Sequence, residues 1–220
     1  MIKFENVTKV FHLHGRKKVV ADNINAVFPT GSSVGLLGRN GAGKSTLLEM
    51  IAGTYEPTSG RIVSTGSISW PVGFAGSFHG ELTGAQNTRF VARIYGVDAD
   101  ELIEFVESFA GLGVHFKLPF RTYSSGMMSR LAFGVSMGIG FDTYLVDEIT
   151  AVGDAAFRAK SSEVFLERMK YSGAVVVTHS VDQVRELCNA VAVLDQGQMT
   201  YYEDIEEGIA HHNQNMRMLS

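Results

Sequence analysis

The sequence predicts an α/β fold in which a mostly parallel sheet follows an N-terminal antiparallel β segment and is interrupted by a helical insertion. The first 30 residues alternate apolar and polar positions, as strands do. Short apolar runs at 34–37, 144–146 and 174–177 are rich in β-forming residues and end in polar ones, as buried parallel strands do. Roughly a hundred residues separate the first two runs, far more than a crossover connection needs, so we expect an inserted helical part.

The composition indicates one globular domain. The chain has 220 residues, 45% hydrophobic and 19% charged residues, and a net charge of −4. This mild acidity disfavours a nucleic-acid partner, because such domains are usually basic on at least one face. The single cysteine, Cys188, cannot form an internal disulfide, and the N-terminus lacks the pattern of a signal peptide. We therefore expect a reduced, cytosolic protein without a membrane span.

The elements follow in order along the chain. The N-terminal antiparallel sheet has as its expected strand positions Ile2, Phe4, Val7, Val19, Val20, Ile24, Ala26 and Phe28. A buried strand at 34–37, a glycine-rich turn and a helix at 44–52 come next, and Gly53 ends the helix. The insertion shows helical patterns at 88–95 and 100–109. A further apolar run at 191–194 is expected to join the parallel sheet.

The glycine-rich turn matches the P-loop pattern, since it reads Gly38-Arg39-Asn40-Gly41-Ala42-Gly43-Lys44-Ser45. Its glycines let the backbone wrap closely around phosphate oxygens, and its N–H groups donate to them. Lys44 supplies a positive charge, Ser45 can bind Mg²⁺, and the following helix presents its positive end. A chance match is the alternative, but the strand before the loop and the helix after it argue against that. The predicted ligand is a nucleoside triphosphate with Mg²⁺, bound by Gly38, Asn40, Gly41, Ala42, Gly43, Lys44, Ser45 and Thr46.

Two adjacent carboxylates, Asp147 and Glu148, follow the run at 144–146. In a P-loop protein the acid at a strand end holds Mg²⁺, here Asp147 together with Ser45, and the next acid can polarise the attacking water. Taken alone, the pair would read as an acidic helix cap. Together with the P-loop it predicts a hydrolase, with Glu148 and Lys44 as catalytic residues.

The later motifs carry a family resemblance. In chain order they are Tyr123-Ser124-Ser125-Gly126-Met127, Asp147-Glu148, Thr150-Ala151-Val152-Gly153-Asp154 and Thr178-His179-Ser180. With the P-loop, this order resembles the ATP-binding subunits of ABC transporters, from Phe4 to about Leu194. The resemblance implies a P-loop NTPase with a RecA-like core, forming a single nucleotide-binding domain over 1–220. It also implies a helical subdomain at about 84–140 that carries the signature sequence.

The resemblance assigns further roles. His179 would be a catalytic residue that donates a hydrogen bond to the γ-phosphate. Ser124, Ser125 and Gly126 would bind the ATP that is held by a second copy of this chain. Asp154 would lie at that interface, so a head-to-tail homodimer enclosing ATP and Mg²⁺ is expected. Phe11 looks like the aromatic that stacks on adenine, although a plain strand aromatic is an open alternative. The remaining histidines match no motif and are expected at the surface or in loops: His12, His14, His79, His115, His211 and His212.

Several positions depart from the usual family pattern. Ser125 stands where glycine is usual, Tyr123 replaces leucine, and Met127 replaces glutamine. The glutamine expected before Leu82-Thr83 is absent and Gln86 comes too late, so water or another side chain must fill its position. Together with Trp70-Pro71, Leu82-Thr83-Gly84 and the run at 89–96, these departures resemble the ATPase subunits of bacterial polysaccharide exporters, the shorter capsular ones in particular.

This finer resemblance implies a location and partners. We expect a peripheral protein on the cytoplasmic face of the bacterial inner membrane, bound to a polytopic permease subunit and acting with periplasmic or outer-membrane polysaccharide export proteins. The segment 70–84 would meet the permease, or it is simply a variable loop. Other open alternatives are an ABC subunit for O-antigen, teichoic acid or a small molecule. A non-transport ABC protein is less consistent with 220 residues, because such proteins typically carry two nucleotide domains or a long coiled-coil insertion.

Overall fold

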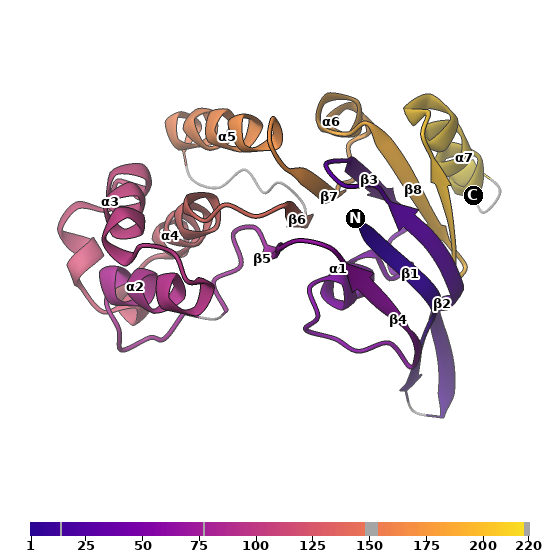
Figure 1. Ribbon diagram of the computed structural model, residues 1–220, viewed down its shortest axis with the longest axis horizontal. Helices are drawn as coiled ribbons and strands as arrows, with labels where there is room; N and C mark the ends of the chain where they lie inside the picture. The colour runs from indigo at the N-terminus through magenta and orange to yellow at the C-terminus, as the bar shows by residue number, and fades with distance from the viewer. Residues whose placement is uncertain (14, 77, 148–153, 218–220) are drawn as a thin grey trace. The chain divides into compact units, whose positions relative to one another are not determined.

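A computed structural model describes residues 1–13, 15–76, 78–147 and 154–217 (Figure 1). The chain divides into two compact units, and each is described by itself. Within the described residues, the first unit comprises 1–71, 141–147 and 171–217, and the second comprises 72–140 and 154–170. No helix in these ranges is long and apolar enough to cross a membrane.

The first unit contains a three-stranded antiparallel sheet with the order β2-β1-β4. The strands are β1 (Ile2–Leu13), β2 (Arg16–Phe28) and β4 (Ser59–Ser64), and Ile2 pairs with Phe28 on one side and Ser64 on the other. The predicted N-terminal antiparallel sheet is confirmed. The sequence did not predict β4, because nearly all of its residues are exposed and its apolar and polar positions do not alternate.

The central sheet of the first unit has six strands in the order β5-β6-β7-β3-β8-β9. They are β5 (Ile68–Pro71), β6 (Thr143–Asp147), β7 (Gly173–Val177), β3 (Ser33–Leu37), β8 (Ala190–Asp195) and β9 (Gln198–Tyr202). Only β9 runs antiparallel to its neighbour. All four predicted inner strands are confirmed, and the carboxyl ends of β6, β7, β3 and β8 therefore meet at one edge. The unpredicted strands, β5 and β9, are the two edge strands.

In the part of the first unit that the structure describes there are three helices: α1 (Lys44–Ile51), α6 (Val181–Leu187) and α7 (Ile205–Arg217). The predicted helix at 44–52 is confirmed, with Ala52 as its C-cap rather than its last residue. Leu47 and Leu48 on α1 are fully buried in a core shared with Leu36 and Val175 of the sheet. Helix α7 packs along β8 (Figure 1).

The second unit is helical. It contains α2 (Gly84–Tyr95), α3 (Ala99–Ala110), two short 3₁₀ helices (Gly113–Lys117 and Phe120–Thr122), α4 (Ser125–Gly138) and α5 (Ala155–Met169). The predicted helical patterns at 88–95 and 100–109 fall inside α2 and α3. Both helices end at a glycine in the left-handed conformation, Gly96 and Gly111. The interior of this unit is aromatic, since the ring of Phe109 contacts the rings of Phe133 and Phe157.

Candidate functional site

The P-loop connects β3 to α1 and is shaped by its own lysine. Lys44 is buried, and its Nζ donates to the carbonyl oxygens of Gly38 at 2.8 Å and Arg39 at 3.1 Å. The ammonium therefore points back into the loop that precedes it. A buried ammonium that donates to carbonyls holds the backbone in a wrapped conformation while keeping its charge within the loop.

At two positions of the loop, neighbouring atoms lie so close to the backbone that only glycine fits. A Cβ on Gly43, where φ is 109°, would lie 2.1 Å from Cγ1 of Val20. A Cβ on Gly38 would lie 2.5 Å from the carbonyl oxygen of Leu194, at the end of β8. The loop is thus pressed against β2 on one side and β8 on the other, and no residue with a side chain fits at either position without moving its neighbours.

The first turn of α1 is open to a ligand. Gly43 is the N-cap residue, so no side chain caps the helix, and no acidic residue lies in the first turn. Ser45 is exposed and Thr46 half-buried in that turn, while Asn40 and Gly41 are exposed in the loop. N-terminal N–H groups without a side-chain cap, next to a buried ammonium, form an environment that favours an anion such as a phosphate.

Asp147 lies at the carboxyl end of β6, half-buried and paired in register with Val177 of β7. The segment after Val177 is fixed by hydrogen bonds: the Thr178 hydroxyl donates to Oε1 of Gln183 at 2.5 Å and accepts from the Ser180 N–H at 3.1 Å. His179 is exposed between these two residues. Asp147 at the end of β6 and His179 just after β7 therefore lie at the carboxyl ends of neighbouring strands, at the sheet edge where the P-loop follows β3. The predicted catalytic Glu148 lies outside the described residues.

A histidine that sequence reasoning missed lies close to this charge cluster. His212 on α7 is half-buried, and its pKa is lowered chiefly by burial and then by the positive charges of Lys44, His179 and His211, while Asp195 raises it. The prediction that His211 and His212 are surface or loop residues is wrong, because both are half-buried on a helix and His211 shares a hydrogen bond of 2.9 Å with the Tyr202 hydroxyl. No sequence motif marks His212; only the fold brings it near Lys44.

Phe11 belongs to a small cluster on the antiparallel sheet. Its half-buried ring lies 5.8 Å from that of Tyr55, and Nζ of Lys9 lies 5.2 Å from the Phe11 ring centroid and 4.1 Å from that of Tyr55. The Lys9 ammonium also donates to the carbonyl oxygen of Glu56. Stacking of Phe11 on adenine stays a prediction.

The signature residues lie at the start of α4 in the second unit. Ser124 is the N-cap, and its hydroxyl accepts from the N–H of Met127 at 3.3 Å. Ser125 and Gly126 form the first turn, and a Cβ on Gly126 would meet no atom within 4 Å. The site is therefore an exposed helix N-terminus, and the side chains that the protein itself places there are small.

Two unusual positions of this unit are physically linked. The hydroxyl of Tyr123, which stands where leucine is usual, donates to the carbonyl oxygen of His115 at 2.7 Å, and burial raises the pKa of this phenol. A Cβ on Gly84 would lie only 2.4 Å from that hydroxyl. The Leu82-Thr83-Gly84 sequence and the Tyr123 departure are thus two sides of one contact.

Asp154 has partners within its own unit. It is the N-cap of α5, where Oδ1 accepts from the N–H of Phe157 at 2.9 Å and Oδ2 pairs with Arg130 at 2.8 Å. The backbone hydrogen bond from Phe157 and the charge of Arg130 lower its pKa. The guanidinium of Arg130 also lies over the Phe157 ring. Asp154 therefore has a structural role in addition to any role at an interface.

Gln86 is engaged in capping. Its side-chain oxygen accepts from the N–H of Thr83 at 2.9 Å, and its N–H donates to the Thr83 hydroxyl at 3.1 Å, which makes a reciprocal capping box at the start of α2. The Thr-x-x-Gln spacing is the sequence signal that could have predicted where α2 begins. Gln86 is used to begin a helix, and this agrees with the inference that it does not replace the missing glutamine.

Comparison with known proteins adds a family and close relatives. A family model described as ABC transporter matches residues 21–151. The polysialic acid transport ATP-binding protein KpsT of Escherichia coli is 50% identical over 95% of this chain and 95% of its own length. The ATP-binding protein BexA of Haemophilus influenzae is 42% identical over 99% of this chain and 100% of its length. The capsule polysaccharide export ATP-binding protein CtrD of Neisseria meningitidis is 42% identical over 97% of this chain and 99% of its own length.

Solved structures test the fold. The ATP-binding cassette MJ0796, in a dimeric post-hydrolysis state bound to ADP and Pi, superposes with a TM-score of 0.76 over 91% of this chain and 97% of that one, at 20% identity. This likeness confirms the predicted α/β fold class with its mostly parallel sheet.

Proposed function

The chain belongs to the ATP-binding subunits of ABC transporters, and we propose on that basis that it hydrolyses ATP to power the export of a capsular polysaccharide across the inner membrane. The ATPase part of the proposal rests on the P-loop. There, the buried Lys44 ammonium donates hydrogen bonds to two carbonyls of its own loop, and the helix that follows has no side-chain cap at its N-terminus. The observation that carries the polysaccharide part is near full-length similarity to capsule relatives.

The residues of the loop fit a Mg²⁺-bound triphosphate. The glycines at 38, 41 and 43 place no side chain over the loop backbone, Lys44 supplies positive charge for the β- and γ-phosphates, and the exposed Ser45 can bind Mg²⁺ through its hydroxyl. Asp147 would complete the protein's share of the metal ligands. Bound Mg²⁺ neutralises charge on the β- and γ-phosphate oxygens. Asn40, Ala42 and Thr46 would contribute backbone or hydroxyl donors, and Phe11 would stack on adenine.

Hydrolysis needs a base and a group that orients the γ-phosphate. Glu148 follows Asp147 directly and would accept a proton from the attacking water. His179 lies after the neighbouring strand, held between Thr178 and Ser180, and would donate a hydrogen bond to the γ-phosphate. The hydrogen bonds of Thr178 would keep that imidazole in place during in-line attack.

The signature residues of the second unit would act on ATP bound to another copy. Ser124, Ser125 and Gly126 offer a hydroxyl and N–H groups at the exposed start of α4, where an anion is favoured. One chain carries one P-loop and one signature sequence, so we propose a head-to-tail homodimer enclosing two ATP molecules. Asp154, at the start of α5, would lie at that interface.

The transporter requires further partners. We propose that the protein works as a peripheral subunit on the cytoplasmic face of the bacterial inner membrane, bound to a polytopic permease and acting with periplasmic or outer-membrane polysaccharide export proteins. Relatives named for the export of O-antigen or teichoic acids are less similar than those named for polysialic acid or capsule export. This order of similarity favours a capsular polymer.

Deletion and complementation test the proposed function. In a bacterium that carries this gene, deletion should leave polysaccharide inside the cell and remove it from the surface, and the wild-type gene should restore export. Lys44→Ala should not restore it, although the protein is present at the same level. Unchanged surface polysaccharide in the deletion strain would overturn the assignment to export.

A further inference from the structure

The strand β2 passes close to the P-loop and carries a lysine there that the proposed chemistry does not use. Val20 of this strand is buried, and its Cγ1 would lie 2.1 Å from a Cβ on Gly43. Two residues earlier on β2, Nζ of Lys18 would lie 3.9 Å from a Cβ on Gly41. The strand therefore packs against the loop at Val20, and the Lys18 ammonium lies beside the loop backbone at Gly41.

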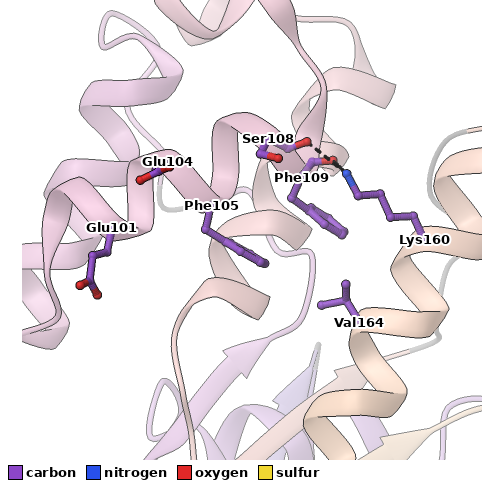
Figure 2. A pocket seen from close by; sticks show the side chains of 7 residues that line it. All are labelled: Glu101, Glu104, Phe105, Ser108, Phe109, Lys160 and Val164. Atoms are coloured by element: carbon purple, nitrogen blue, oxygen red, sulfur yellow. Dashed lines mark hydrogen bonds between the residues drawn. The ribbon is translucent and has the colours of Figure 1, made fainter.

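The charge of Lys18 is not used within the chain. Among the residues that the structure describes, Lys18 forms no ion pair and no side-chain hydrogen bond. A lysine of the second unit shows the contrast: Nζ of Lys160 donates to the carbonyl oxygens of Ser108 and Phe109, each at 3.1 Å (Figure 2). Lys18 is also exposed. Its ammonium is therefore available to an anionic ligand that reaches the P-loop.

The pairing of β1 with β2 places Lys18 beside the proposed adenine contact. Phe11 on β1 is the direct partner of Lys18 in the antiparallel register. Directly opposed residues of two adjacent strands carry their side chains on the same face of the sheet. Lys18 thus shares a face with Phe11 and has its ammonium beside Gly41. A nucleotide with its adenine on Phe11 and its phosphates in the P-loop would pass this ammonium.

Lys18 and Lys44 differ in how they would act on a phosphate chain. Lys44 is buried and donates to two carbonyl oxygens of its own loop. Lys18 is exposed, and an ion pair at an exposed position is weak and is screened by salt. A contact of this kind, made equally with the substrate and the transition state, changes affinity and not turnover. Lys18 is therefore suited to binding ATP and not to catalysis.

We propose that Lys18 is a further ATP-binding residue, whose ammonium holds the phosphate chain from the side of the antiparallel sheet, beside Gly41. The inference rests on the proposed function, because it takes ATP as the ligand of the P-loop. Lys18 lies outside every motif of the sequence, and only the packing of β2 against the loop brings it to the nucleotide. The antiparallel sheet then supplies two groups to ATP, the ring of Phe11 for the base and the charge of Lys18 for the phosphates.

Neutralising Lys18 tests the proposal with the whole chain. The Kd for Mg-ATP is measured by isothermal titration for wild type, Lys18→Gln and Lys18→Arg. The Kd of Lys18→Gln should rise about threefold to tenfold at low ionic strength and less than about twofold in about 0.5 M NaCl, because salt screens an exposed ion pair. Lys18→Arg keeps the charge and should bind within about twofold of wild type.

The matched control is Lys17→Gln. It removes the same charge from the adjacent residue of β2, which is also exposed and points to the opposite face of the strand. Its Kd for Mg-ATP should stay within about twofold of wild type. In the assembled transporter, Lys18→Gln should raise the KM for ATP and leave kcat within about twofold, because the contact does not change between the substrate and the transition state.

The possible outcomes separate this inference from the proposed function. If the wild-type chain does not bind Mg-ATP, the proposed function fails. If wild type binds and Lys18→Gln binds equally tightly, Lys18 does not contact the nucleotide and the inference is wrong. Equal losses in Lys17→Gln and Lys18→Gln would mean that only the general charge of the strand matters, which also overturns it. A loss that persists at high salt, or that Lys18→Arg shares, would assign Lys18 a structural role instead of a contact with ATP.

Discussion

In each unit a lysine donates hydrogen bonds to backbone carbonyls, but the two lysines lie in different settings. We infer from this difference that the first unit serves nucleotide chemistry and the second serves assembly with another molecule. In the first unit, buried Lys44 donates to Gly38 and Arg39 within a loop pressed between β2 and β8. In the second, exposed Lys160 donates to Ser108 and Phe109 at the end of a helix. The first lysine is the one proposed to contact the phosphates of ATP, whereas the second stabilises the end of a helix.

The P-loop and the signature residues also differ in the contacts that hold them in place. The P-loop is built from close backbone contacts with the sheet, so its shape is fixed by the core of its own unit. The signature residues are held by local helix-start contacts, in which the Ser124 hydroxyl accepts from the Met127 N–H and the Ser124 carbonyl accepts from the Met128 N–H, and nothing lies within 4 Å of a Cβ at Gly126. We infer that the first unit binds nucleotide by itself, while the second presents groups that act only when another molecule approaches.

The largest expected effect comes from removing the buried ammonium. Lys44→Ala should lower the ATPase rate of the assembled transporter by about 10²–10³-fold and weaken ATP binding, because the positive charge at the phosphates is lost. Steady-state phosphate release and fluorescent-nucleotide titration measure both effects. Lys160→Ala, which removes the corresponding lysine of the other unit, should leave nucleotide binding by the isolated chain within about twofold. If both variants lost nucleotide binding to the same extent, the inference that the first unit binds nucleotide by itself would be wrong.

Adding a methyl group to one glycine of each unit sharpens the comparison. Gly43→Ala must move Val20 and strain a backbone at φ 109°, so it should destabilise the fold by about 1–3 kcal/mol and weaken ATP binding. Gly126→Ala places the methyl in open space within a helix and should stabilise it by up to about 1 kcal/mol. Urea unfolding of the isolated chain reports both changes. Two destabilised variants would show that α4 is more constrained than its contacts indicate.

A change at Tyr123 tests whether the stability of the second unit can be altered without a change in nucleotide affinity. Tyr123→Phe removes the hydroxyl that donates to His115 and should cost about 1 kcal/mol, which lowers the melting temperature by about 2–4 °C. ATP affinity of the isolated chain should not change. Tyr171→Phe is the matched control, because that phenol is 85% exposed. A nucleotide affinity that falls with Tyr123→Phe would contradict the independence of the two units.

The smallest expected effect is a pH dependence confined to the first unit. Burial and the charges of Lys44 and His179 lower the pKa of His212, so the folded state takes up this proton less readily than the unfolded chain. This group should therefore reduce stability as pH falls through the usual histidine value of about 6.5 and have no effect well above it. We expect the negative charge of a bound triphosphate to favour the protonated form of His212, so ATP affinity should increase as the pH falls.

His212→Gln removes that dependence. Isothermal titration of ATP between pH 5.5 and 8 should show a smaller pH slope for His212→Gln than for wild type, whereas His115→Gln in the second unit should keep the wild-type slope. The same slope in all three proteins would show that His212 does not sense the nucleotide's charge.

The sequence allowed much of this architecture to be predicted. Buried parallel strands are apolar throughout, so β3, β6, β7 and β8 could be recognised, and the P-loop followed from its glycine spacing. The exposed strand β4 and the edge strand β9 lack that pattern. His212 could not be found because its proximity to Lys44 depends on how α7 packs against β8, which no local pattern encodes. The capping box of Thr83 and Gln86, by contrast, is a local pattern that the spacing of these two residues could have revealed.

The most direct test of the proposed roles of the two units combines a change at the proposed general base, Glu148, with a change in the signature sequence. Glu148→Gln cannot accept a proton, so turnover should fall by about 10²–10⁴-fold while ATP still binds. Size-exclusion chromatography with Mg-ATP should then show a stable dimer for Glu148→Gln, and only a monomer for Glu148→Gln/Ser124→Arg, although the double variant binds ATP with nearly the same affinity. A double variant that dimerises equally well, or a single variant that stays monomeric at saturating Mg-ATP, would contradict the account.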